Sequence, residues 1–257
     1  MKKVTFAPFD GYVFGDIATL NFYDQDLIID VLNSDNVVKH CAIVVQETFI
    51  EKEYAKYPVK ECIVVDVGAF YGDTAIYFLR EGALKVYCFE PYISAMFINK
   101  NVMINRFKVK QVEVNNSPVL GTAHEVKYHH FGINDGALKW REEGEGEADK
   151  SITLDDIVTK IISERGDNTE TSNMVLKMDC EGAEHEIFEK VDRNKLRKFK
   201  YIMLEVHDGR YDDVKANLEK FGSFLYGTMH PSKSDIITFA PPANSLNLAE
   251  GSVNSRA

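Results

Sequence analysis

Residues 62–74 read CIVVDVGAFYGDT. The first six form an almost continuous apolar run, which is typical of a strand buried on both faces of a parallel sheet. Gly68 and Gly72 follow, and glycines let a backbone loop approach a ligand at the N-terminus of the next helix. Helical patterns alternate with further strand-like runs at 85–90, 109–114, 174–179 and 201–206. This alternation predicts a doubly wound, mostly parallel α/β sheet that binds ligands at the carboxyl ends of its strands.

The chain divides into three predicted parts. Residues 1–59 do not follow the alternation, and we expect them to form an N-terminal cap: a hairpin over Gly15 and Asp16, then a helix from about 24 to 32. The main domain covers 60–240 and ends with two strands near 223–228 and 235–239. Residues 241–257 lack periodicity, which predicts a disordered tail.

Composition and charge restrict the class of partner. The chain has 257 residues and a net charge of −10, which argues against nucleic-acid binding because a phosphate backbone attracts basic surfaces. No run is apolar enough to span a bilayer, and the N-terminus lacks the apolar core of a signal peptide. The four cysteines contain no C-x-x-C pair, which predicts buried free thiols in a reducing cytoplasm. We therefore expect a cytoplasmic protein whose partner is a small molecule or glycan.

The loop after the first strand bears on the cofactor. A dinucleotide fingerprint needs G-x-G-x-x-G, and Phe70 stands at the middle glycine position. Glu90 ends the second strand, where its carboxylate can accept hydrogen bonds from ribose hydroxyls. An acid in strand one (Asp66), the glycine loop and Glu90 together suit S-adenosylmethionine, which has a ribose but no pyrophosphate. A nicotinamide-dependent oxidoreductase and a non-catalytic S-adenosylmethionine-binding protein are the alternatives.

Six motifs then occur in a familiar order: IVVDVGAFYGDTAIYF (63–78), VYCFEPYISA (86–95), Asn115-Asn116, ITLDDIV (152–158), LKMDCEGAEHEIFE (176–189) and YIMLEVH (201–207). Over about 60–207 the sequence resembles the FkbM-like methyltransferases. The resemblance implies the class I S-adenosylmethionine-dependent fold with a seven-stranded mixed sheet. It also implies O-methyl transfer to a hydroxyl of a sugar, glycolipid or polyketide-like molecule.

The resemblance also assigns the cofactor site. It places Asp66, Gly68 and Gly72 in the loop on the methionine side, Glu90 at the ribose, and Asn115 or Asn116 near the adenine. The full set of cofactor-binding residues expected on this basis is Asp66, Gly68, Ala69, Gly72, Asp73, Thr74, Glu90, Pro91, Asn115, Asn116 and Asp179. Phe70-Tyr71 is bulkier than the family's usual pair, which leaves the details of the cofactor contacts open.

Methyl transfer to a hydroxyl requires positioning and a base that takes the proton. The ends of strands four and five offer Asp179 and Glu181 on one side, and Glu205 and His207 on the other. Asp179 and His207 are the candidate bases, while Glu181 has either a catalytic role or a favourable position at a helix N-terminus. Asp179, Glu205 and His207 have the ligand types of a divalent-metal site, but they form no compact cluster in the sequence, so we predict no metal.

The segment after strand four favours a hydroxyl acceptor. Residues 179–182 read DCEG, whereas amino-directed enzymes acting on nucleic-acid bases carry an Asn/Asp-Pro-Pro-aromatic element there. In the helix that follows, apolar residues at 183, 187 and 191 face inward. This spacing predicts that His185, Glu186 and Glu189 lie on the surface, and it leaves Glu184 open.

Overall fold

A sheet of mostly parallel strands forms the centre of the computed structural model, which describes residues 2–6, 9–56, 58–127, 148–165, 173–180, 182–206, 211–219, 224–228 and 235–240. The strand order is β12-β13-β11-β10-β5-β6-β7. Five strands run parallel: β5 (Ile63–Val67), β6 (Lys85–Phe89), β7 (Val112–Asn115), β10 (Met174–Met178) and β11 (Phe199–Val206). The strand β13 (Asp235–Ala240) pairs antiparallel with β11 and with β12 (Phe224–Thr228). The predicted α/β fold with a parallel sheet is confirmed.

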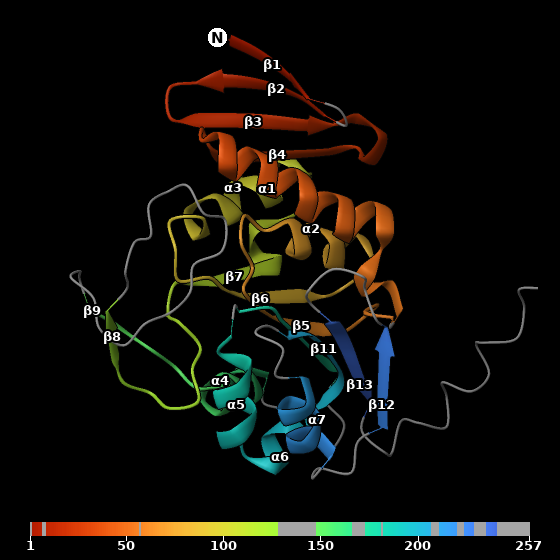
Figure 1. Ribbon diagram of the computed structural model, residues 1–257, viewed down its shortest axis with the longest axis vertical. Helices are drawn as coiled ribbons and strands as arrows, with labels where there is room; N and C mark the ends of the chain where they lie inside the picture. The colour runs from red at the N-terminus through yellow and green to blue at the C-terminus, as the bar shows by residue number, and fades with distance from the viewer. Residues whose placement is uncertain are drawn as a thin grey trace, which may run out of the picture.

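Helices cover both faces of this sheet (Figure 1). One side carries α1 (Asp35–Val45), α2 (Asp73–Arg80) and α3 (Ala95–Ile104); the other carries α4 (Leu154–Arg165), α5 (Glu184–Lys190), α6 (Arg193–Leu196) and α7 (Tyr211–Glu219). Side chains of β5 alternate between the two layers: Val64 packs with the α1–α3 side, and Val65 and Val67 with the other. Because both faces are buried, β5 reads as an almost unbroken apolar run.

The N-terminal region is a separate antiparallel sheet of β1 (Lys2–Phe6), β2 (Phe9–Phe14), β3 (Ile17–Phe22) and β4 (Leu27–Leu32). The predicted hairpin over 15–16 is the β2–β3 connection. The predicted helix over 24–32 is wrong, because the short 3-10 turn η1 (Tyr23–Gln25) and a left-handed Asp26 lead into a strand instead. β-branched residues at 28, 29 and 31 favour that strand, and a short apolar run does not distinguish a strand from a helix.

Two asparagines, one in α3 and one directly after it, connect this sheet to the rest of the molecule by hydrogen bonds. The Oδ1 atom of Asn101 accepts the Asp30 N–H at 2.8 Å, and its Nδ2 donates to the carbonyls of Asp30 and Tyr71 at 3.0 and 2.9 Å. Asn105 exchanges two further hydrogen bonds with the Ile28 backbone. The buried Asn101 therefore joins β4 directly to the loop that follows β5.

Several shorter elements complete the described chain. α1 continues into the π-helical turn η2 (Gln46–Glu51) and is followed by the 3-10 turn η3 (Glu53–Lys56). The predicted strand over 109–114 begins with the 3-10 turn η4 (Val109–Gln111), so β7 starts only at Val112. The pair β8 (Glu125–Lys127) and β9 (Ala148–Lys150) is antiparallel.

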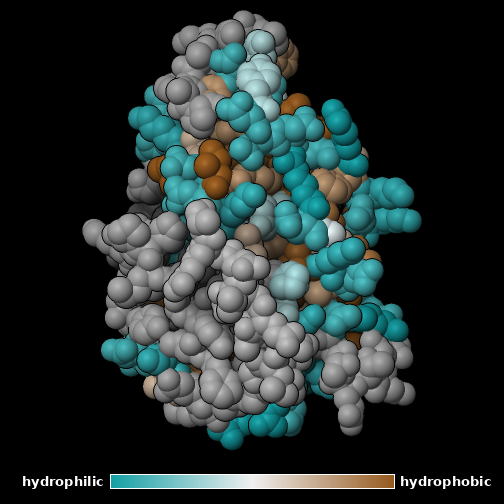
Figure 2. All heavy atoms as spheres, turned by 90° about the vertical axis from the view of Figure 1, so that its right-hand side faces the viewer, coloured by the Kyte–Doolittle hydropathy of each residue, from teal (hydrophilic) through white to brown (hydrophobic). Residues whose placement is uncertain are grey.

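On the face shown in Figure 2 the described residues are mostly hydrophilic, and apolar side chains form small separate groups. None of the helices in the described ranges has the length and apolar character needed to cross a bilayer. All four cysteines are free thiols; Cys41, Cys62 and Cys88 are buried, and Cys180 is half-buried.

Candidate functional site

The strand register brings the predicted site residues to one edge of the sheet. Lys177 of β10 lies opposite Asp66 of β5, and Phe89 of β6 lies opposite both Val67 and Asn115. Pairing continues past the strand ends in three backbone hydrogen bonds: Asp179 N–H to Val67 O at 3.0 Å, Gly68 N–H to Phe89 O at 2.9 Å, and Glu90 N–H to Asn115 O at 3.1 Å. Residues that are distant in the sequence therefore meet at the carboxyl edge.

The loop 68–72 is a tight turn that requires its glycines. Gly68 has φ +78°, and a Cβ there would lie 1.7 Å from the Asp179 carbonyl oxygen. Gly72 has φ +86°, and its Cβ would lie 3.0 Å from the Ile98 side chain. Phe70 also has a positive φ of 46°, a conformation that costs a non-glycine residue about 1–2 kcal/mol. Its N–H donates to Glu90 Oε2 at 2.9 Å, which holds the loop against β6.

A buried lysine lies beneath this loop. Lys177 is 2% exposed; its Nζ donates to the Gly68 carbonyl at 2.7 Å and lies 3.4 Å from Asp66 Oδ1 and 3.8 Å from Asp179 Oδ2. Burial disfavours its ammonium form, but Asp66, Asp179 and the other nearby carboxylates outweigh this effect and raise the pKa of Lys177. The ammonium group thus joins the ends of β5 and β10. Sequence reasoning gave it no role, although a lysine within a buried strand was a visible signal.

Two buried aspartates at the same edge are incompletely satisfied. Asp66 Oδ2 accepts the Thr74 hydroxyl at 2.6 Å, but Asp66 Oδ1 has no hydrogen bond beyond its ion pair with Lys177. Neither carboxylate oxygen of Asp73, the first residue of α2, has a hydrogen-bond partner among the described residues. Burial raises the pKa of Asp73 to about 7 and also raises that of Asp66. Buried polar atoms are usually paired, so these oxygens favour a ligand that carries a cation or donor.

Glu90 is held by three protein donors. It is 5% exposed; Oε2 accepts the Phe70 N–H, and Oε1 accepts the Tyr92 N–H at 3.2 Å and the Ser94 hydroxyl at 3.0 Å. Burial raises the pKa of Glu90 to about 7. A carboxylate has about four acceptor positions, so one further donor fits without displacing a protein group. A contact with both ribose hydroxyls would require one of the three protein donors to give way.

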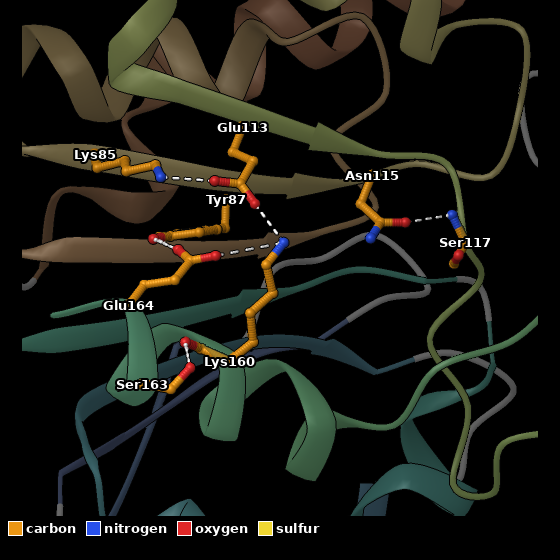
Figure 3. A network of polar contacts seen from close by, with 8 residues as sticks. All are labelled: Lys85, Tyr87, Glu113, Asn115, Ser117, Lys160, Ser163 and Glu164. Atoms are coloured by element: carbon orange, nitrogen blue, oxygen red, sulfur yellow. Dashed lines mark hydrogen bonds and ion pairs between the residues drawn. The ribbon is translucent and has the colours of Figure 1, made fainter. Parts of the chain in front are cut away.

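The other predicted cofactor residues lie nearby with different exposure. Ala69 is buried in the loop, Pro91 is half-buried and Asn116 is exposed. Asn115 is half-buried, and its Oδ1 accepts the Ser117 N–H at 2.8 Å (Figure 3), so its amide N–H is the group it can offer a ligand.

Figure 3 also shows a separate polar network further back along β6 and β7. Lys85 and Lys160 both bind Glu113, at 2.6 and 2.5 Å, and Tyr87 donates to Glu164 at 2.9 Å. These contacts tie α4 to the two strands.

The structure describes two of the four predicted catalytic residues, Asp179 and Glu205. Asp179 is half-buried directly after β10, and Glu205 is half-buried on β11. Glu205 shares a sheet face with Lys177, since Lys177 pairs with Met203 and alternate residues share a face. Glu181 and His207 lie outside the described residues. Among those described, no three His, Cys, Asp or Glu side chains are grouped as metal ligands would be.

The helix α5 differs from its prediction at His185 and Glu186, and the structure settles Glu184, which the sequence left open. His185 was expected on the surface, which is wrong, because it is only 7% exposed. Glu184 is fully buried and accepts the N–H groups of Cys180 and Gly182 at 2.9 and 2.8 Å, which closes the turn after β10. Because α5 packs on both the sheet and α7, its buried face is wider than a single inward row. Glu189 is exposed as predicted, and Glu186 is half-buried.

Two residues of the N-terminal segment lie at this edge, and neither was predicted from the sequence. The His40 ring, on α1, packs edge-on against Phe70 with centroids 5.2 Å apart. The buried ring of Tyr54, in η3, lies 5.9 Å from Lys177 Nζ. No local motif surrounds either residue, so only the folded structure could reveal them.

Comparisons with known proteins gave a family match and similar folds. The profile of the methyltransferase FkbM domain matches residues 66–234, about two thirds of the chain. A search of curated protein sequences gave no match. Among solved structures, SMU.776, which was solved in complex with SAH, is 8% identical with a TM-score of 0.52; the match covers 89% of this chain but only 57% of that one. The ribosomal protein L11 methylase of Lactobacillus delbrueckii subsp. bulgaricus is 9% identical with a TM-score of 0.42, over 82% of this chain and 80% of that one.

The likeness to SMU.776 shows the fold alone, and the chain spans just over half the length of that structure. The family match is independent of it and covers the loop after β5, the end of β6 and the end of β10. This chain belongs to the FkbM domain family of methyltransferases.

Proposed function

We propose that this protein is an S-adenosylmethionine-dependent O-methyltransferase that methylates a hydroxyl of a sugar, glycolipid or polyketide-like small molecule. One observation carries the choice of cofactor: the incompletely satisfied carboxylates of Asp66 and Asp73 beside the loop 68–72. S-adenosylmethionine brings an ammonium and a sulfonium, which these carboxylates attract. A nicotinamide dinucleotide would bring a pyrophosphate, which they repel.

The edge offers a suitable hydrogen-bonding or charged group for each part of the proposed cofactor. Asp73, with Asp66, would accept the methionine ammonium, and Glu90 would accept a ribose hydroxyl at its remaining acceptor position. Asn115 would offer its amide N–H to the adenine. When bound, S-adenosylmethionine supplies a methyl group on a positively charged sulfur, which is a good leaving group. The Lys177 ammonium lies 3.4 Å from Asp66 Oδ1 and 3.8 Å from Asp179 Oδ2, so it supplies a positive charge to both carboxylates.

We also propose the class I methyltransferase arrangement, a seven-stranded mixed sheet in the domain 60–240 capped by residues 1–59. The strand order, with β13 antiparallel beside β11, supports this assignment. The cap is supported by the hydrogen bonds of Asn101 to Asp30 and by the position of α1 against Phe70. The contact of α1 with loop 68–72 supports a role of this cap beside the entering acceptor.

The charge of the site favours a neutral acceptor rich in hydroxyls. Asp179 and Glu205 are carboxylates at the substrate edge, and hydroxyl groups donate well to carboxylates. An anionic acceptor, including a nucleic acid, would be repelled by them and by the net charge of −10. Sugars and glycolipids meet these requirements.

The direct test is a screen of sugars, glycolipids and small phenols with methyl-labelled S-adenosylmethionine. We expect label in one acceptor class, with an equal amount of S-adenosylhomocysteine formed. Binding of S-adenosylhomocysteine without transfer to any acceptor would support a non-catalytic binding protein instead. Hydride transfer from a nicotinamide cofactor would establish the oxidoreductase alternative and overturn the proposal.

A further inference from the structure

The helix α1 brings an imidazole into contact with loop 68–72 of the candidate site. His40 is half-buried, and its ring meets Phe70 at an interplanar angle of 85°. Phe70 lies between Gly68 and Gly72, in the loop assigned to the cofactor, and its backbone is tied to Glu90. A side chain in contact with this loop is therefore close to the methyl-transfer position implied by the proposed function.

The ring nitrogens of His40 are available for a ligand. Within the described part of the chain, no backbone or side-chain group forms a hydrogen bond with them. Burial lowers the pKa of His40, and the charge of Asp179 opposes this effect. The net effect lowers the pKa of His40 below its ordinary value of 6.5, which favours the neutral imidazole that a general base requires.

Three other charged groups lie on neighbouring elements. Asp30 of β4 is ion-paired with Lys100, and Asp73 of α2 is buried without a hydrogen-bond partner among the described residues. Lys177 Nζ of β10 lies 3.8 Å from the Asp179 carboxylate. The negative charge of Asp179 acts on His40 and favours its imidazolium form.

We propose that His40 is the general base of methyl transfer and that Asp179 stabilises its protonated form; this rests on the proposed function. The acceptor hydroxyl gives its proton to a ring nitrogen of His40 while the oxygen forms its bond to the methyl carbon. The electron pair of the methyl–sulfur bond returns to sulfur, and the proton later leaves the imidazolium for water. The base therefore comes from α1 rather than from the ends of β10 or β11.

The first test observes His40 directly by NMR of the histidine side chains in the full chain. The resonance that disappears in His40→Gln is assigned to His40. The matched control is His124→Gln, which removes a histidine whose Nδ1 is hydrogen-bonded to the Thr122 carbonyl. We expect His40 to titrate below pH 6.5 and to shift when S-adenosylhomocysteine saturates the protein. Asp179→Asn should lower its pKa further, because the stabilising charge is removed.

Two NMR results would overturn the proposal. One is a His40 resonance that stays unmoved while calorimetry shows S-adenosylhomocysteine bound; the other is a His40 pKa above 7 in that complex. Failure of S-adenosylhomocysteine to bind would instead refute the proposed function. The His40 titration in Asp179→Asn would still measure the interaction between His40 and Asp179.

The second test uses an acceptor identified by the labelled-methyl screen. His40→Gln should lower kcat by about 10²–10⁴-fold, abolish the acidic limb of the pH–rate profile and change S-adenosylhomocysteine affinity by less than about threefold. His124→Gln should leave all three unchanged. Wild-type turnover in a folded His40→Gln protein would exclude His40 as the base.

Discussion

Replacing Asp73 by Asn should stabilise the cofactor-free protein at alkaline pH. Burial raises the pKa of Asp73 from its ordinary value of 3.8 to about 7, so ionising it in the folded state is unfavourable. Below pH 4 the side chain is protonated in both folded and unfolded chains. Between about pH 4 and 7 the unfolded chain loses the proton and the folded one keeps it, so the wild type becomes less stable as the pH rises.

The magnitude follows from the difference of about three pH units between the two pKa values. Each unit corresponds to about 1.4 kcal/mol, so the ionised carboxylate costs about 4 kcal/mol at pH 8. Asn removes the charge but leaves a buried amide with unmet hydrogen bonds, at a cost of about 1–3 kcal/mol. We therefore expect Asp73→Asn to raise the free energy of unfolding at pH 8 by about 1–3 kcal/mol, with no gain at pH 4.

Urea unfolding followed by circular dichroism at pH 4, 6 and 8 measures this effect. Asp35→Asn is the matched control, because Asp35 is also the first residue of a helix but is exposed; it should change stability by less than about 0.5 kcal/mol. An equal loss of stability in Asp73→Asn at all three pH values would refute the reasoning. The same variant should bind S-adenosylhomocysteine at least about tenfold more weakly, because it loses a charged acceptor for the ammonium.

Two other predictions concern the groups around the loop. Lys177→Met should lower the free energy of unfolding at pH 7 by about 3–5 kcal/mol, because it leaves Asp66 buried without a counter-ion. Urea unfolding measures this loss, with the exposed Lys190→Met as the control. A loss below about 1 kcal/mol would contradict the prediction. Glu90→Ala should weaken S-adenosylhomocysteine binding by about 10–100-fold in calorimetry, since it removes both the proposed acceptor for the ribose and the acceptor of the Phe70 N–H. Unchanged affinity would show that the ribose does not bind Glu90.

The central sheet and the turn at its carboxyl edge could be predicted because their signals are local. The apolar run before Gly68 marks a strand buried on both faces, and the glycines after it mark a close turn; the 1.7 Å approach of a Cβ at Gly68 to the Asp179 carbonyl shows why no other residue fits. Glu90 was placed correctly at the strand end for the same reason.

What the sequence did not predict depends on contacts between distant segments. The strand β4 was mistaken for a helix because a short, mostly apolar stretch, here interrupted by Asp30, is compatible with both, and only its pairing with β3 decides. His40 and Tyr54 approach the site from residues 35–56, and no spacing rule relates them to Phe70 or Lys177.

The buried charges were missed for a related reason. Lys177 and Glu184 are charged residues that polarity alone assigns to the surface, yet Lys177 is buried against Asp66, and Glu184 accepts backbone N–H groups. Their burial depends on the register of β10 with β5 and on the turn after β10. Neither could be read from composition or helical periodicity.

The central claim is that the carboxyl edge of this sheet binds S-adenosylmethionine through Asp66, Asp73 and Glu90. Isothermal titration calorimetry with S-adenosylhomocysteine, run in parallel with NADH on the wild type and on Asp73→Asn, tests it most directly. We predict micromolar binding of S-adenosylhomocysteine to the wild type, weaker binding to a fully folded Asp73→Asn, and no binding of NADH. Binding of NADH without S-adenosylhomocysteine, or equal S-adenosylhomocysteine affinity in both proteins, would contradict the account.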